Sequence, residues 1–168
     1  MKLLTAALAA TTLALPALAS AKDIVRVYGA PESPIASLTL VPAGSDIAFV
    51  SGTTPGAGPG QPVPVGTEAQ TFDVLTKIDA LLKAQGMTMG DVVMMRVFLG
   101  VDPDKGGHAD RAGMNNAFKK FFGTSDQPNK PARTTVAITD TQPGRFVEID
   151  AMAAKPHKAA AVAHKKKS

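Results

Sequence analysis

The sequence predicts one α+β domain, in which six strands form a single sheet and two helices pack on one of its faces. Short segments of alternating or β-branched residues are separated by turns rich in Gly and Pro, as in strands. Two longer segments repeat apolar residues at the three- and four-residue spacing of a helix. Because two helices cover only one face of such a sheet, we expect further copies of the chain to bury the other face.

A signal peptide is predicted at residues 1–21. Lys2 gives it a positive start, and the apolar run at 3–18 is too short and too rich in alanine to span a bilayer. Small residues favour cleavage after Ala21, with cleavage after Ala19 as the alternative. The sequence thus predicts a periplasmic or secreted protein. It contains no cysteine, which excludes disulfides and thiolate metal sites.

The predicted domain, residues 22–154, is slightly acidic although the whole chain is basic. The chain has 18 Lys and Arg against 14 Asp and Glu, but Lys2 and five lysines after Ala154 lie outside the domain, which leaves twelve against fourteen. A net charge of −2 is a poor match for nucleic acid. Residues 155–168 are predicted to be a disordered, solvated tail, and adhesion to an anionic membrane or cell-wall polymer is the alternative role.

Three strands are predicted before the first helix, at 24–28, 38–41 and 47–50. The turn residues at 42–45 predict a hairpin between the second and third of them. The segment 53–66 is dense in Gly and Pro and is predicted to be a loop.

The first helix is predicted to begin at Thr67, with Gln70 completing a capping box, and to end at Gly86. Its predicted buried stripe is Ala69, Phe72, Leu75, Ile78 and Leu82. The next segment, 92–101, is apolar except for Arg96, as expected of a central strand covered on both faces.

The second helix is predicted over 110–122, followed by strands at 133–138 and 146–153. The residues expected on the buried face of this helix are Met114, Ala117, Phe118 and Phe121. The last strand alternates, with Val147, Ile149 and Ala151 on one face and Glu148, Asp150 and Met152 on the other.

Few residues in the domain suit metal or nucleotide chemistry. His108 is its single histidine, which argues against a multi-histidine metal site or a Ser-His-Asp triad, and we interpret it as a solvated loop residue. The glycines at 56–60 lie far from a helix start and alternate with prolines, so they do not form a phosphate-binding loop. We expect no cofactor and no metal.

Arg133, Glu148 and Asn115 are the candidate functional residues. An arginine at a strand edge can hold a carboxylate through two hydrogen bonds, and a nearby carboxylate can orient or deprotonate a water. On spacing alone, all three also fit ordinary surface residues.

Several short motifs resemble, in order, those of the Rid (YjgF) family of reactive-intermediate deaminases. They are Phe-Val-Ser-Gly at 49–52, Glu-Ala-Gln at 68–70, Met-Asn at 114–115, Phe-Phe at 121–122, Pro-Ala-Arg at 131–133 and Val-Glu-Ile-Asp-Ala at 147–151. The resemblance covers about 46–154. It implies a chorismate-mutase-like fold with one mixed sheet, assembled as a homotrimer whose sheets form a barrel and whose clefts lie between subunits.

The resemblance also implies residue roles. Arg133 would bind the carboxylate of the substrate, and Glu148 would serve a water near the imine carbon. Asn115 and Ser51 would line the cleft, and the backbone of Thr135 would face the substrate. The implied activity is hydrolysis of reactive imines or enamines of 2-oxo acids to the 2-oxo acid and ammonia.

The chain departs from the family pattern near its start, where family deaminases often carry a tyrosine after Gly-Pro and this chain has Ser33-Pro34-Ile35. Its loop at 102–110 is also longer, and a predicted signal peptide precedes the domain. The missing tyrosine favours an alternative function, that of a non-catalytic periplasmic protein that binds small carboxylates or has a protective role. RNA cleavage, sometimes attributed to the family, is disfavoured by the acidic domain and by export.

Overall fold

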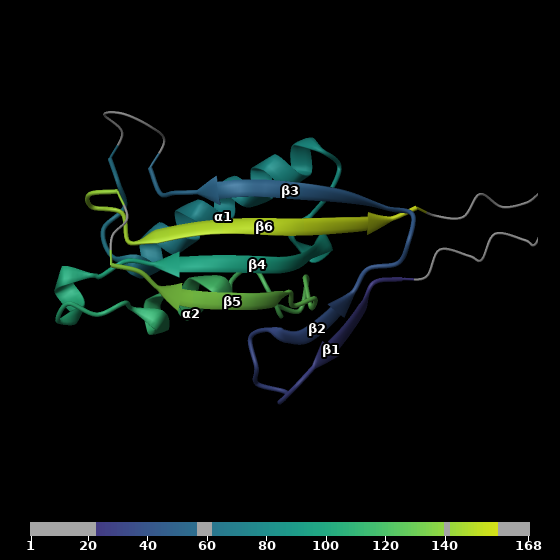
Figure 1. Cartoon of the computed structure of the whole chain (residues 1–168), viewed down its shortest axis with the longest axis horizontal. Coiled ribbons are helices and arrows are strands. Elements are labelled where there is room, and N and C mark those ends of the chain that lie inside the picture. Colours follow the sequence, from purple (N-terminus) through teal and green to yellow (C-terminus); the bar gives the residue numbers. More distant parts are fainter. Residues whose placement is uncertain (1–22, 57–61, 140–141, 158–168) are drawn as a thin grey trace, which may run out of the picture.

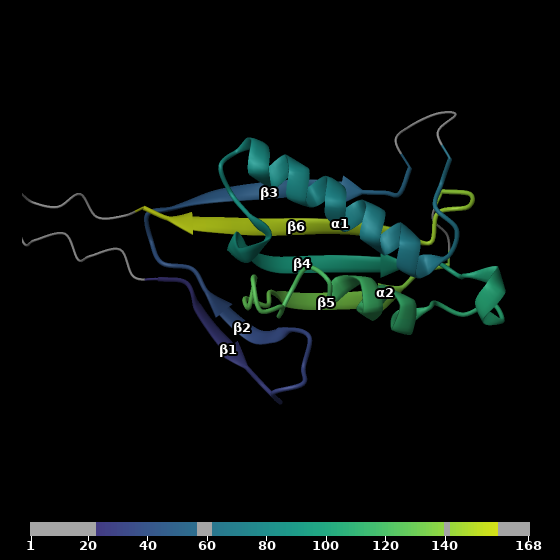
Figure 2. The ribbon, with the colours of Figure 1, turned by 180° about the vertical axis from the view of Figure 1, so that it is seen from behind.

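The computed structural model describes residues 23–56, 62–139 and 142–157, so the predicted signal peptide and most of the predicted tail lie outside it. Within these ranges one mixed sheet has the strand order β1-β2-β5-β4-β6-β3, and two helices lie on one of its faces (Figures 1 and 2). This confirms the predicted class. The elements are β1 (Val25–Tyr28), β2 (Ala36–Leu40), β3 (Ser45–Thr53), α1 (Thr67–Ala84), β4 (Val92–Leu99), α2 (Arg111–Phe118), β5 (Ala132–Ala137) and β6 (Val147–Pro156), with short 3-10 turns at Met89–Asp91 and Pro103–Lys105.

Strand β4 lies inside the sheet, as its apolar sequence predicts. It pairs in parallel with β5 and antiparallel with β6, so that Val97 has Thr135 on one side and Ile149 on the other. Strand β3 pairs with the outer side of β6. Strands β1 and β2 form a hairpin that joins β5 through one parallel pair, Ala36 with Ala132, and projects from that side of the sheet (Figure 1).

The hairpin predicted between the second and third strands is wrong. Strand β2 pairs with β1 and β5, whereas β3 lies at the opposite edge of the sheet. The predicted turn does form locally, because the Ser45 hydroxyl donates to the Pro42 carbonyl at 2.8 Å, but it directs the chain across the sheet. Strand β3 has nine residues and β6 has ten, so this pairing satisfies more backbone groups than pairing with the five-residue β2 would.

The capping box predicted at the start of the first helix is also wrong. Gly66 is the residue before the helix, and no side chain caps it. Thr67 is buried and donates to Asp102 Oδ2 at 2.9 Å, and the buried Gln70 donates to the Gly144 carbonyl at 2.8 Å. Both side chains therefore bind the helix to loops that are distant in sequence.

The core lies between the helices and the sheet. Leu75, Ile78 and Leu82 are buried as predicted, but Ala69 and Phe72 are exposed, and the buried positions near the helix start belong to Gln70, Thr71 and Val74. Phe72 contacts Phe121 with the ring centroids 5.2 Å apart. On α2 the predicted Met114, Ala117 and Phe118 are buried. None of the helices in the described ranges is long and apolar enough to cross a membrane.

Strand β6 alternates as predicted, with Val147, Ile149 and Ala151 buried under the helices. It continues past the predicted end of the domain at Ala154, so Lys155 and Pro156 belong to the sheet.

Two truncations should distinguish strand from tail. A chain that ends after His157 should melt at the same temperature as the full mature chain. A chain that ends after Ala154 loses the pairing of Lys155 with Asp46 and of Pro156 with Ser45. Its free energy of unfolding should fall by about 1–2 kcal/mol, since each backbone hydrogen bond contributes about 1 kcal/mol. Thermal unfolding measures this difference, and equal melting temperatures would contradict it.

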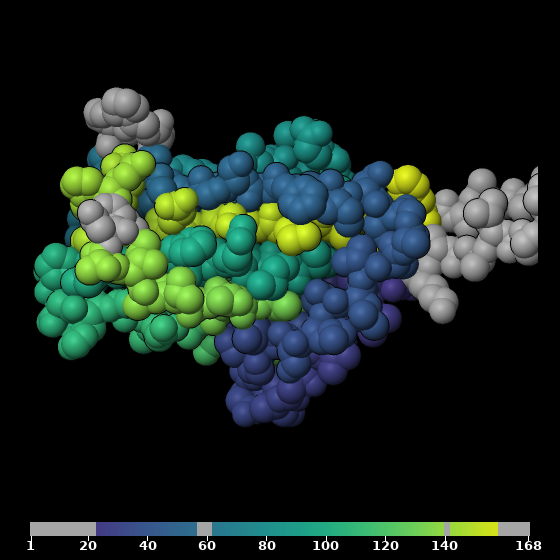
Figure 3. Space-filling model, viewed as in Figure 1, coloured from purple at the N-terminus to yellow at the C-terminus, as the bar shows by residue number. Residues whose placement is uncertain are grey.

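The face of the sheet without helices, here called the open face, is uncovered and carries several exposed apolar side chains. Figure 3 shows β3, β6, β4 and β5 side by side on it, with no helix in front of them. Its exposed side chains include Phe49 (74% exposed), Ile47 (42%) and Met152 (37%). Phe49 and Met152 are cross-strand neighbours. A patch of this kind is typical of an interaction surface.

Candidate functional site

The arginine of the Pro-Ala-Arg motif lies on the helix side of the sheet. Arg133 pairs with Met95 and Thr135 pairs with Val97, and both partners are completely buried under the helices. Directly opposite residues on neighbouring strands point to the same face. The side chains of Arg133 and Thr135 therefore point toward α2.

Helix α2 holds the Arg133 guanidinium from three directions. Arg133 Nη2 donates to Asn115 Oδ1 at 2.8 Å, and Nη1 lies 3.5 Å from the Met114 sulfur. The guanidinium carbon lies 4.4 Å from the centre of the Phe118 ring. The hydrogen bond to the Asn115 amide and the contact with the Phe118 ring together fix the plane of the group. The structure thus brings together two of the candidate residues, Arg133 and Asn115.

The positive charge of Arg133 has no carboxylate partner among the residues that the structure describes. Burial, and then the nearby charge of Arg111, lower the pKa of Arg133 to about 10. The group remains charged at neutral pH, and no described acidic side chain compensates its half-buried charge. An anion with two oxygens would complete it.

Thr135 lies two residues further along the same face of β5. Its carbonyl accepts a hydrogen bond from Arg111 Nη1 at 3.3 Å, so a neighbouring side chain engages part of the backbone that, by the resemblance, would face the substrate. The buried Thr135 hydroxyl has no partner in the described part of the chain.

Glu148 lies on the opposite, open face. It pairs with Phe98 and stands between the buried Val147 and Ile149. Its near neighbour is Gly52 on β3, because a β-carbon built on Gly52 would overlap the Glu148 carboxylate. Ser51, next along β3, is exposed.

The candidate residues therefore form two groups on opposite faces of one sheet. The clamp group consists of Arg133, Asn115 and Thr135, and the acid group consists of Glu148 and Ser51. Alternation along the last strand predicts the direction of Glu148, but the direction of Arg133 follows from the register between β5 and β4, which the sequence does not reveal. One chain cannot place Arg133 and Glu148 on the same small substrate.

A pocket of about 550 Å³ lies on the open face beside the acid group. Ser51, Gly52 and Phe49 line it together with an ion pair that sequence reasoning missed. Arg96 Nε lies 3.0 Å from Asp150 Oδ1, and Arg96 Nη2 lies 2.8 Å from Asp150 Oδ2. Strand alternation alone could have placed both residues on this face, but the register was needed to pair them.

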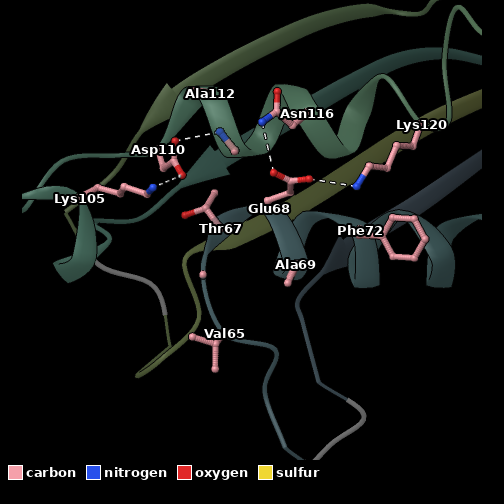
Figure 4. Close-up of a pocket in the computed structure, with 12 residues that line it drawn as sticks. Val65, Thr67, Glu68, Ala69, Phe72, Lys105, Asp110, Ala112, Asn116 and Lys120 are labelled. Atoms are coloured by element: carbon pink, nitrogen blue, oxygen red, sulfur yellow. Dashed lines mark hydrogen bonds and ion pairs between the residues drawn. The ribbon is translucent and has the colours of Figure 1, made fainter.

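A second pocket, of about 610 Å³, lies between the first turns of α1 and α2 (Figure 4). Its charged groups bind one another. Glu68 accepts from Lys120 at 3.0 Å and from Asn116 at 3.2 Å, and Lys105 lies 3.6 Å from Asp110. None of the candidate residues lines it. Its size alone therefore does not make it the functional site.

The described residues contain no group of three or more side chains that could hold a metal ion. His108 is exposed, and its backbone pairs with that of Asp102. The side chains of the two groups offer a guanidinium, an amide, a carboxylate and two hydroxyls.

Comparison with known proteins agrees with the family that the sequence motifs resemble. A family model described as Endoribonuclease L-PSP matches residues 32–155. The chain is also similar to the YjgF gene product of E. coli, with 27% identity and a TM-score of 0.53 over 64% of this chain and 79% of that one. The chain belongs to the Rid (YjgF) family.

Other Rid-family relatives cover the same region. A RutC family protein of Pyrococcus horikoshii is 30% identical over 135 residues, which is 80% of this chain and 98% of the relative. The structure of E. coli TdcF with bound serine is 28% identical with a TM-score of 0.56, over 68% of this chain and 84% of that one. The Rid fold that the motifs imply is thereby confirmed.

Proposed function

We propose that this Rid-family protein hydrolyses reactive imines or enamines of 2-oxo acids, outside the cytoplasm, to the 2-oxo acid and ammonia. The observation that carries the proposal is the half-buried Arg133 guanidinium, oriented by Asn115 and Phe118 and without an acidic partner among the described residues. Its planar fork suits a carboxylate. The similar TdcF structure contains serine, which also carries a carboxylate, and this supports the assignment.

In the proposed reaction, Arg133 binds the carboxylate of the imino acid and holds the imine carbon in place. Glu148 accepts a proton from a water as the water oxygen forms a bond to that carbon. The nitrogen takes up protons, the C–N bond breaks, and ammonia leaves. The carbon keeps the new oxygen as a carbonyl, so one imine and one water give one 2-oxo acid and one ammonia. No side chain forms a covalent bond.

The reaction as proposed requires two copies of the chain, because the clamp group and the acid group face opposite sides of the sheet. A homotrimer whose sheets form a barrel would cover the open face and could bring the Glu148 of one copy to the Arg133 of the next. The exposed Phe49 and Met152 on that face support such an assembly.

Assembly gives a direct prediction. The mature protein should sediment at about three times the mass of one chain, as expected of a closed trimer. Phe49→Glu should yield monomers, because burying an unpaired charge in the interface is unfavourable. Leu81→Glu is the matched control, since Leu81 is exposed on α1 rather than on the open face. A stable wild-type monomer at micromolar concentration would contradict both the interface and the shared site.

One observation favours the second function, binding of small carboxylates without turnover. The single tyrosine of the chain, Tyr28, lies on β1 beside Lys130, away from both groups of candidate residues. Ile35, in the segment where family deaminases often carry a tyrosine, packs against the core. An amino-acid oxidase that generates imines continuously, followed by measurement of imine decay with and without the mature protein, separates the two functions. Faster decay supports the deaminase, whereas 2-oxo acid binding without faster decay supports the binding protein.

A further inference from the structure

The carboxylate of Glu148 rests directly on the backbone of Gly52. The three heavy atoms nearest to a β-carbon built on Gly52 all belong to Glu148: the Oε1 atom would overlap it, and Cδ and Cγ would lie 3.1 and 3.4 Å away. No other residue at this position could leave the carboxylate where it is, because every other residue has a β-carbon.

The conformation of the backbone does not explain this glycine. Eight glycines in the described ranges have a positive φ, and Gly52 is not among them. An alanine at Gly52 would therefore be compatible with the strand. The absence of a side chain at Gly52 instead leaves room for the Glu148 carboxylate.

A bulge in β3 creates the contact. Val50 pairs with Ala151 and Thr53 pairs with Ile149, so Ser51 and Gly52 together lie opposite Asp150. An extra residue of this kind bends a strand and redirects its side chains, and such bulges are frequent next to functional sites. The bulge brings the Gly52 backbone under the carboxylate.

The Glu148 carboxylate has no polar partner among the described residues. It makes no hydrogen bond or ion pair with them, and the nearby Arg96 is engaged by Asp150. Alternation along β6 sets the face on which Glu148 lies, and the close approach to Gly52 sets where on that face its carboxylate lies.

We propose that Gly52 is a positioning residue for Glu148, which by lacking a side chain lets the carboxylate lie over β3 where it can serve the reacting water. This inference rests on the proposed deaminase function. Gly52→Ala would push the flexible end of the Glu148 side chain aside and leave the fold intact.

The expected result for Gly52→Ala is a selective loss of turnover. Turnover of the imine should fall by about tenfold or more, since a displaced base forfeits much of its contribution. Affinity for pyruvate should change less than about twofold, because the clamp group is untouched, and the melting temperature should stay the same. Gly29→Ala is the matched control: Gly29 also lacks a positive φ, and its β-carbon would meet only the Ser37 hydroxyl closely, at 3.1 Å.

A double-mutant cycle with Glu148→Asp separates positioning from a general structural effect. The shorter side chain withdraws the carboxylate from Gly52, so adding Gly52→Ala in the Glu148→Asp background should cost little further activity. A purely structural role of Gly52 would lower turnover by the same factor in both backgrounds, which would overturn the inference.

Two further outcomes separate this inference from the function on which it rests. Normal turnover in Gly52→Ala, together with lost turnover in Glu148→Gln, would overturn the role of Gly52 and leave the deaminase standing. Absence of turnover in the wild type would remove the deaminase itself. In that case crystal structures of the wild type and Gly52→Ala decide the positioning: a displaced carboxylate supports it and an unmoved one overturns it.

Discussion

Glu148→Gln should lower turnover of a 2-imino acid by about 100-fold or more while pyruvate still binds, because the amide keeps the shape of the side chain but cannot accept a proton. Binding should persist because Arg133 binds the carboxylate of the ligand, whereas Glu148 acts on the water. Imine decay in the oxidase-coupled assay measures turnover, and calorimetry with pyruvate measures binding.

Glu68→Gln is the matched control for this variant. It makes the same chemical change at an ion pair on α1, outside both groups of candidate residues. It should leave imine decay unchanged. Wild-type turnover in Glu148→Gln would remove Glu148 from the mechanism.

Arg133→Lys should weaken binding of pyruvate by about 1–3 kcal/mol, because a lysine keeps a charge but loses the two-pronged fork that Asn115 and Phe118 orient. Arg26→Lys is a useful contrast. Arg26 donates to the Gly90 and Val92 carbonyls away from the clamp, so this variant should lower the melting temperature and leave affinity unchanged. Unaltered affinity in Arg133→Lys would exclude the clamp.

In Arg133→Lys, the affinity for pyruvate should also become dependent on pH. Burial, followed by the charge of Arg111, lowers the pKa of Arg133 from its ordinary value to about 10, so wild-type affinity should be constant from pH 7 to 9. A lysine begins from a pKa of about 10.4, and the same surroundings lower it toward neutrality. Its positive charge is then lost as the pH rises, and affinity should fall between pH 7 and 9. Calorimetry across this range checks the contrast.

Much of the fold could be predicted because local patterns determine it. The helical spacing of Leu75, Ile78 and Leu82 and the apolar run of β4 have the structures that these patterns predict. Turn residues before β3 predict a change of direction, but they do not say which strand becomes the partner, and β3 pairs with β6. Thr67 and Gln70 suit a helix cap locally, yet distant partners such as Asp102 engage them instead.

The candidate site was predictable as a set of residues and not as an arrangement. The motifs identify Arg133 and Glu148, and helical and strand periodicity places each on an element. Whether they face the same side depends on the register of β5 against β4 and of β4 against β6, which are long-range pairings. The close contact of Gly52 with Glu148 likewise depends on a bulge, for which the Ser-Gly sequence is only a weak signal.

The central claim, a deaminase site shared between copies of the chain, is tested most directly by mixing two inactive variants. Arg133→Ala and Glu148→Gln are unfolded together in equal amounts, refolded, and assayed for imine decay. In a trimer that takes Arg133 from one copy and Glu148 from the next, random assortment makes about a quarter of the sites intact. Recovery of about a quarter of wild-type turnover is therefore expected, whereas a mixture no more active than the separate variants would contradict the shared site.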